Sequence, residues 1–143
     1  MTMIQLEDDM SISPQIDIGS LRTLAAAGVK MIINNRPDGE EPGQPTSVET
    51  KAAAAEHGID YRHIPVTANT LSLDHIDEFA SAMAEAQGPI LAYCKSGYRS
   101  TLLWGLAMVR VNGAAPSDVL EKAGSAGMDL SSARPLMEQM AGQ

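Results

Sequence analysis

Cysteine occurs once in this chain of 143 residues, at Cys94, and aromatic side chains make up only 3% of the sequence. A single cysteine excludes an intramolecular disulfide and any metal site that needs several thiolates. With so few aromatic rings, we expect the nine methionines and Trp104 to help fill the hydrophobic core. The one thiol is either a small buried apolar group or a reactive group with a function of its own.

Basic residues and long apolar segments are also scarce. Ten Lys and Arg residues stand against eighteen Asp and Glu residues, which gives a net charge of −8, and the basic residues are scattered along the chain. This pattern argues against a nucleic-acid partner. No apolar run approaches the roughly 20 residues that a membrane helix needs, and the N-terminal segment MTMIQLEDDM lacks the features of a secretory signal. We expect a cytoplasmic protein with no membrane partner, and the sequence leaves its oligomeric state open.

Turn and capping signals divide the chain into alternating strands and helices. Short apolar runs rich in β-branched residues predict strands, while Asp17, Thr46 and Ser72 precede helical patterns as candidate N-caps. Segment 36–45 is rich in proline, glycine and acidic residues, so we expect a long surface loop there. The predicted strands are 10–13, 29–35, 61–66 and 90–94, and the predicted helices are 17–27, 46–58, 73–86, 100–113, 116–125 and 131–140.

Helices of about 10 to 15 residues between successive strands indicate right-handed crossovers and a mainly parallel α/β sheet with helices on both faces. The length and the 44% apolar content suit one compact domain that spans residues 1–143. In sheets of this kind, ligands bind beyond the carboxyl ends of the strands. Cys94 lies at such an end, which makes the loop after it the candidate functional site.

The segment CKSGYRS, residues 94–100, has the features of an anion-binding loop between a strand and a helix. Backbone N–H groups and the positive end of the helix dipole point into such a loop. Together with Lys95 and Arg99 they should stabilise the thiolate form of Cys94, and Gly97 permits the backbone angles of a tight turn. The candidate catalytic residues are Cys94, Arg99 and Ser100, and the candidate substrate- or anion-binding residues are Lys95, Ser96, Gly97 and Tyr98.

The same segment resembles two related signatures, the active-site loop of rhodanese sulfurtransferases and the Cys-x5-Arg-Ser/Thr loop of tyrosine and dual-specificity phosphatases. Through MIINNRPDGEEPGQPT, YRHIPV, GPILAYCKSGYRS and LLWGLA, the chain resembles the bacterial beta-lactamase hydrolase-like family, phosphatase-like domain, over residues 3–136. The resemblance implies a phosphatase-type three-layer sandwich with a four- or five-stranded, mostly parallel sheet. Some members are fused to a metallo-β-lactamase-type persulfide dioxygenase, so the resemblance implies such an enzyme as a candidate partner.

Two features of the sequence favour sulfur over phosphate as the transferred group. Four residues separate Cys94 from Arg99, whereas the phosphatase signature has five, and a shorter loop makes a smaller cradle for a phosphoryl group. The aspartate that protonates the leaving group in these phosphatases aligns with Thr70. We therefore expect a rhodanese-type sulfurtransferase that moves sulfane sulfur from thiosulfate or a persulfide, through a Cys94 persulfide, to a thiol acceptor. No cofactor is expected.

Two alternatives remain open. A cysteine-dependent phosphatase would use Cys94 as the nucleophile, Arg99 as the phosphate clamp and Ser100 to help release the thiolate, with Asp74 as a weak candidate for the acid. A non-catalytic module would use the same loop to bind an anion or to dock a partner. Both enzyme hypotheses require a small oxyanion or persulfide substrate that reaches Cys94.

Arg36, His63 and Asp74 are candidates for the rim of the pocket. Arg36 ends the second predicted strand, on the sheet edge where Cys94 lies, but a salt bridge with an acidic residue of its own loop explains it equally well. His63 lies on a strand and Asp74 in the first turn of a helix, where each has an ordinary structural role. The three histidines share no metal-ligand spacing, so we expect no metal site.

Overall fold

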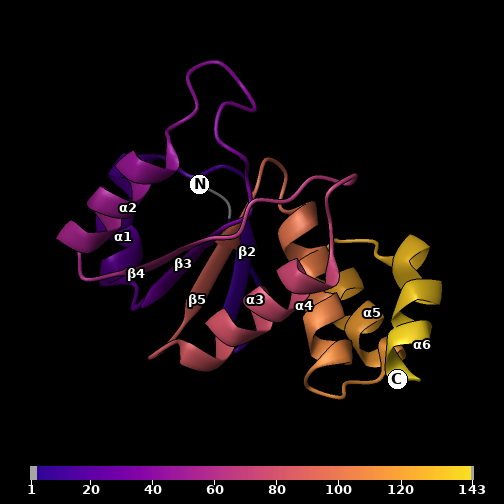
Figure 1. Ribbon diagram of the computed structural model, residues 1–143. Helices are drawn as coiled ribbons and strands as arrows, with labels where there is room; N and C mark the ends of the chain where they lie inside the picture. Colours follow the sequence, from indigo (N-terminus) through magenta and orange to yellow (C-terminus); the bar gives the residue numbers. More distant parts are fainter. Residues whose placement is uncertain (1–2, 143) are drawn as a thin grey trace.

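The computed structural model describes residues 3–142, which form a five-stranded mixed sheet covered by helices on both faces (Figure 1). This architecture confirms the predicted α/β class. The strands are β1 (Ile4–Glu7), β2 (Met10–Ser13), β3 (Met31–Asn34), β4 (Asp60–His63) and β5 (Ile90–Tyr93). The helices are α1 (Leu21–Ala26), α2 (Ser47–Glu56), α3 (Leu73–Glu85), α4 (Tyr98–Arg110), α5 (Pro116–Ser125) and α6 (Arg134–Ala141).

The strand order is β1-β2-β5-β3-β4, with β5 at the centre of the sheet. Strands β2, β5, β3 and β4 run parallel, as the alternation of strands and helices predicted, and their register aligns Ile12, Ala92 and Ile33. Strand β1 was not predicted and pairs antiparallel with β2. It is a short edge strand whose one buried side chain is Leu6, so its sequence carries no apolar run.

Each face of the sheet carries its own hydrophobic core, because side chains alternate between the faces along each strand. Ile32 and Leu91 point to one face, where they cluster with Leu24 of α1 and Ala54 of α2. The opposite face carries the larger core, to which α3, α4, α5 and α6 all contribute. Trp104 of α4 is completely buried in this larger core. The sheet is therefore the middle of three layers, as the family resemblance implied.

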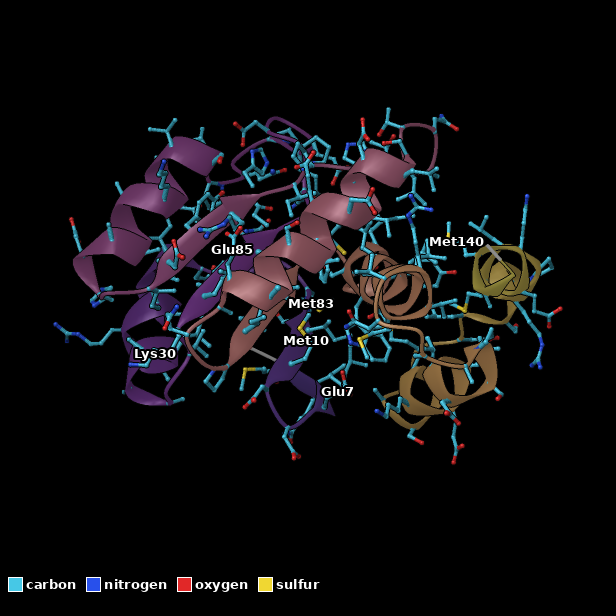
Figure 2. All side chains as sticks on the ribbon, turned by 60° about the horizontal axis from the view of Figure 1, so that its bottom comes forward. Glu7, Met10, Lys30, Met83, Glu85 and Met140 are labelled. Atoms are coloured by element: carbon cyan, nitrogen blue, oxygen red, sulfur yellow. The ribbon has the colours of Figure 1, made fainter. Side chains whose placement is uncertain are left out.

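Methionine side chains occupy core positions that aromatic rings often fill in other proteins. Met10, Met31, Met137 and Met140 are between 0% and 5% exposed. Met10 of β2 belongs to the larger core, and the partly buried Met83 of α3, labelled beside it in Figure 2, packs against that core. The expectation that methionines help to fill the core is confirmed for these residues.

The helix ends follow the predicted caps in two of three places. The side chains of Thr46 and Ser72 each accept a hydrogen bond from the third backbone N–H of the following helix, so both predicted N-caps are confirmed. Asp17 makes no such bond, because the 3-10 turn Ile18–Ser20 lies between it and α1. None of the helices within residues 3–142 is long and apolar enough to cross a membrane.

Candidate active site

Cys94 directly follows the central strand β5, and its side chain is completely buried. Its Sγ atom accepts a hydrogen bond from the backbone N–H of Gly97 at 3.1 Å. Gly97 has a φ of 94°, in the left-handed region that residues with a side chain rarely adopt. The turn therefore requires glycine, and it directs a backbone N–H at the thiol.

Helix α4 begins at Tyr98, two residues before the predicted start at Ser100. The difference arises because Gly97 turns the chain directly into the helix, which leaves only three residues between Cys94 and α4. Arg99 therefore lies in the first helical turn rather than in a loop. The positive end of the α4 dipole is thus next to the thiol, as expected from the sequence.

Buried polar side chains fasten the start of α4 to the ends of neighbouring strands. Ser100 is completely buried, and its hydroxyl donates to Oδ1 of Asn35 at 2.8 Å. Nδ2 of Asn35 donates to the carbonyl of Ile64 at 2.9 Å, and the hydroxyl of Thr101 donates to the carbonyl of Gly97 at 2.8 Å. We expected the hydroxyl of Ser100 to donate a hydrogen bond that supports the thiolate of Cys94. In the structure this hydroxyl donates to Asn35 instead.

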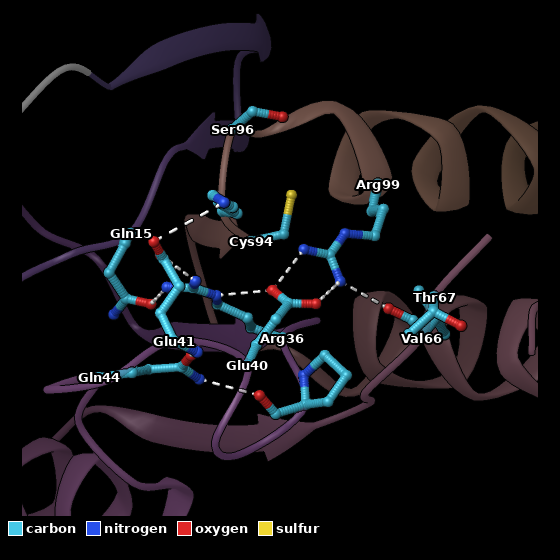
Figure 3. Close-up of polar contacts among 12 residues, drawn as sticks. Gln15, Arg36, Glu40, Glu41, Gln44, Val66, Thr67, Cys94, Ser96 and Arg99 are labelled. Atoms are coloured by element: carbon cyan, nitrogen blue, oxygen red, sulfur yellow. Dashed lines mark hydrogen bonds and ion pairs between the residues drawn. The ribbon is translucent and has the colours of Figure 1, made fainter.

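A carboxylate from the loop between β3 and α2 binds the guanidinium of Arg99, as Figure 3 shows. Nη1 and Nη2 of Arg99 donate to the two carboxylate oxygens of Glu40 at 2.9 and 2.8 Å. Nη1 also donates to the carbonyl of Val66 at 2.8 Å. Glu40 and Arg99 are 59 residues apart, and their pairing was not predicted from the sequence.

Arg36, a candidate rim residue, is only 2% exposed and donates to three side chains. Its Nε donates to Oε1 of Glu40 at 2.8 Å, its Nη1 to Oε1 of Gln15 at 2.9 Å and its Nη2 to Oε1 of Glu41. Lys95 approaches the same loop, with Nζ 3.7 Å from Oε2 of Glu41. The alternative interpretation of Arg36, a salt bridge within its own loop, is confirmed, and the shared Glu40 also links Arg36 to Arg99.

These contacts fix the charge state of Glu40. The hydrogen bonds from Arg99, and then those from Arg36, outweigh the opposing effect of burial and lower the pKa of Glu40 to about 2. The same pairing raises the pKa of Arg99. At neutral pH Glu40 is therefore a carboxylate with no proton to donate. Among residues 3–142, no group of three or more His, Cys, Asp or Glu side chains is arranged to hold a metal ion.

A largely apolar pocket of about 390 Å³ opens beside Arg99. Tyr98 of α4, which we expected to contact the anion, lines this pocket. The pocket offers room for an uncharged part of a ligand whose anionic part lies at Arg99. Its lining residues are Glu40, Val66, Thr67, Ala68, Leu71, Tyr98, Arg99 and Leu102.

The other two candidate rim residues, Asp74 and His63, line a separate hollow formed by β4 and α3. Nε2 of His63 donates to the backbone carbonyl of Arg36 at 2.8 Å, which is a structural contact. Thr70, at the aligned position of the phosphatase acid, is hydrogen bonded to Thr67 in its own turn. The carboxylate that the structure brings to the site is thus that of Glu40 rather than that of Asp74.

The site combines three features of a phosphatase-like α/β domain. A thiol lies at the carboxyl end of the central parallel strand, a backbone N–H of the following turn donates to this thiol, and an arginine lies in the first turn of the next helix. Residues 2–111 match the family model described as beta-lactamase hydrolase-like protein, phosphatase-like domain. The chain belongs to this family, as the motifs of the sequence implied.

Known relatives are similar to this chain along most of its length. A beta-lactamase hydrolase-like protein of Agrobacterium fabrum is 38% identical over 139 residues, which cover 97% of this chain and 32% of that protein, so the chain spans about a third of that relative's length. A solved structure of a candidate phosphatase from Neisseria meningitidis is 32% identical, with a TM-score of 0.85 and coverage of 98% and 99% of the two chains. The structure of PTPMT1, at 16% identity, a TM-score of 0.74 and coverage of 98% and 94%, shares the fold.

These comparisons favour the phosphatase alternative over rhodanese-type sulfur transfer, which was our first expectation. The family model is described as phosphatase-like, and the Neisseria protein is described as a candidate phosphatase. None of these descriptions names a sulfurtransferase. The short loop between Cys94 and Arg99 was therefore given too much weight, because it is compatible with membership in a phosphatase-like family.

Proposed function

We propose that this domain is a cysteine-dependent phosphatase that hydrolyses phosphate monoesters. One observation carries the proposal: three residues separate Cys94 from α4, and the first turn of α4 carries the guanidinium of Arg99, which already binds an oxyanion, the carboxylate of Glu40, through two hydrogen bonds. The planar fork of an arginine matches the oxygens of carboxylate and phosphate groups alike. Membership in a phosphatase-like family supports the same chemistry.

In the proposed reaction, the thiolate of Cys94 attacks phosphorus while the bond between phosphorus and the ester oxygen breaks. The ester oxygen leaves with the bonding electron pair, and the phosphoryl group stays on Sγ. Arg99 and the N–H groups at the start of α4 stabilise the negative charge on the phosphoryl oxygens. A water molecule then attacks the phosphocysteine, which releases inorganic phosphate and restores the thiolate.

The surroundings of Arg99 favour substrates whose leaving group is stable as an anion. Glu40, paired with two arginines, is deprotonated at neutral pH, and Asp74 lies in a different hollow. A leaving group that needs no proton is therefore expelled more readily than an alkoxide. The apolar pocket beside Arg99 has room for such a group, so we favour aryl phosphates.

Hydrolysis of p-nitrophenyl phosphate and of a phosphotyrosine peptide tests this function in wild type and Cys94→Ser. We expect both activities to fall to background in Cys94→Ser. We also expect mass spectrometry of acid-quenched wild-type reactions to find the phosphoryl group on Cys94. Turnover that survives in Cys94→Ser would contradict the proposal. The peptide is the stricter substrate, because its leaving oxygen is harder to expel than p-nitrophenolate.

Sulfur transfer remains the second candidate function because the side chain of Cys94 is completely buried, which suits a small group on Sγ. In that reaction the thiolate takes the outer sulfur of thiosulfate, releases sulfite and passes the sulfur to a thiol or to cyanide. The persulfide dioxygenase suggested by the family resemblance would be a partner for this function. Thiosulfate treatment followed by mass spectrometry distinguishes the two candidates, since a gain of one sulfur on Cys94 supports transfer and an unchanged mass rules it out.

A further inference from the structure

The carboxylate of Glu40 bridges two arginines from different parts of the chain (Figure 3). Its Oε1 atom accepts hydrogen bonds from Nε of Arg36 and Nη2 of Arg99, both at 2.8 Å, and its Oε2 atom accepts one from Nη1 of Arg99 at 2.9 Å. Arg36 is only 2% exposed, which is rare for a guanidinium. Two of its three side-chain partners, Glu40 and Glu41, are carboxylates, so this buried guanidinium already binds oxyanions.

The balance of charge in this cluster favours a ligand with more negative charge than a carboxylate. Apart from Cys94, whose thiolate adds one negative charge in the proposed reaction, the cluster contains three cations, Arg36, Lys95 and Arg99, and two anions, Glu40 and Glu41. With Glu40 in place its net charge is +1, and without Glu40 its net charge is +2. A doubly charged oxyanion therefore complements the two guanidinium groups better than a single carboxylate does.

We propose that Arg36 and Arg99 form a two-arginine anion site, which the chain's own Glu40 fills in the free protein and which the substrate's phosphoryl dianion enters by displacing Glu40. The identity of this anion as a phosphoryl group rests on the proposed function. Arg36 is then a substrate-binding residue, in addition to Arg99. Glu40 is an internal competitor that weakens the binding of every oxyanion, and it excludes ligands that cannot replace both of its contacts.

Displacement of Glu40 requires little rearrangement elsewhere. Its side chain is already 25% exposed, so water lies next to the carboxylate. The loop keeps contacts that do not involve Glu40, since Gln44 donates to the carbonyl of Pro37 and the N–H of Ser47 donates to Asp38. Strand β3, which ends two residues before Arg36, and helix α4, which carries Arg99, can therefore stay in place while Glu40 leaves.

Calorimetric titration with inorganic phosphate tests the proposal in a Cys94→Ser background, where no chemistry occurs. We expect Glu40→Gln to bind phosphate about tenfold more tightly than the parent, because the competing charge is gone. Glu41→Gln is the matched control, since Glu41 bonds to Arg36 but its contacts do not include Arg99. The control measures the general effect of removing one negative charge, so equal gains in the two variants would overturn the proposal.

The role of Arg36 is tested by Arg36→Lys in the Glu40→Gln background, because lysine keeps the positive charge and loses the Nε–H group that binds the carboxylate of Glu40. We expect the gain in phosphate affinity to disappear, and an unchanged gain would contradict the proposal. If this variant does not fold, NMR of the arginine Nε–H groups in the Glu40→Gln protein gives the answer. Phosphate should then shift the signals of both Arg36 and Arg99, and a shift confined to Arg99 would exclude the two-arginine site.

These binding measurements are independent of catalysis. If Glu40→Gln binds phosphate more tightly but wild type hydrolyses neither phosphate ester, the proposed phosphatase function is contradicted and the two-arginine anion site is supported. If hydrolysis depends on Cys94 but Glu40→Gln gains no more phosphate affinity than Glu41→Gln, the phosphatase function is supported and the role of Glu40 as an internal competitor is contradicted.

Discussion

The turn after Cys94 and the loop that carries Glu40 meet at one anion site, but different forces hold them. The turn is fixed by buried neutral hydrogen bonds, in which Ser100, Asn35 and Thr101 bind one another or backbone carbonyls. The loop is held by ion pairs whose carboxylates, Glu40 and Glu41, are 25% and 47% exposed. Dissolved ions compete with such pairs but not with buried neutral bonds. We therefore call the turn after Cys94 the fixed part of the site, because buried hydrogen bonds hold it. We call the Glu40 loop the exchangeable part, because other ions can replace its partly exposed ion pairs.

The largest effect is expected from breaking the buried network with Asn35→Ala. Asn35 is completely buried, and its loss leaves the Ser100 hydroxyl and the carbonyl of Ile64 without their partners. We expect the free energy of unfolding to fall by about 3 kcal/mol, because two buried polar groups become unsatisfied. Urea unfolding measures this loss, and Asn69→Ala, at an exposed loop position, is the control. Equal stabilities of the two variants would show that the turn is not held by the network.

Gly97→Ala should cost about 2 kcal/mol of stability, because alanine is strained at a φ of 94°. The same variant should lose most hydrolysis of p-nitrophenyl phosphate, since the N–H of residue 97 would no longer be aimed at Sγ of Cys94. Gly124→Ala is the matched control within helix α5, where nothing lies within 4 Å of the added Cβ. That control should be slightly more stable than wild type, by about 0.5 kcal/mol. A Gly97→Ala protein with wild-type stability and activity would show that the turn tolerates a side chain.

The ion pairs of the Glu40 loop should appear as a dependence of stability on pH. The folded protein lowers the pKa of Glu40 from 4.5 to about 2, so the carboxylate stabilises the fold above pH 4.5 and this contribution is lost as the pH falls toward 2. Because Glu40 is partly open to water, we expect a contribution of about 1 kcal/mol after solvent screening. Urea unfolding of wild type and Glu40→Gln, at pH 7 and at pH 3, checks this. The difference between the two proteins should shrink at pH 3, and a constant difference would contradict the ionic account.

The fixed part of the site was largely predictable from sequence, because its signals are local. The apolar run before Cys94, the glycine at position 97 and the leucines of the next helix all lie within a few residues of one another. They placed a thiol at the end of a parallel strand and the positive end of a helix next to it. What they could not give was the start of α4 at Tyr98, because a left-handed glycine can either extend a loop or enter a helix directly.

The exchangeable part was not predictable in detail, since its partners are 59 residues apart and lie on an irregular loop. The sequence placed Arg36 at the correct sheet edge and surrounded it with acidic residues, which was enough to expect a salt bridge. Only the order of the strands, with β3 beside β5, brings that loop to Arg99. The acidic residues that follow Arg36 were the available signal for Glu40, but the alignment placed the acid at Thr70, and Asp74 is the carboxylate nearest to that position in the sequence.

The smallest effect is expected from Lys95→Ala. This variant tests whether the positive charge of Lys95 contacts the substrate directly or only attracts it from a distance. Lys95 is 59% exposed, and its ion pair with Glu41 is long at 3.7 Å. We expect kcat/KM for p-nitrophenyl phosphate to change by less than about threefold and the stability to stay the same, because exposed ion pairs contribute little. The change should also shrink as salt is added, since screening weakens a charge that only attracts the substrate from a distance. The control is Lys51→Ala, because Lys51 is also an exposed lysine but lies on α2. A loss of more than tenfold that persists in high salt would instead place Lys95 on the substrate, as the sequence first suggested, and would extend the fixed part of the site by one residue.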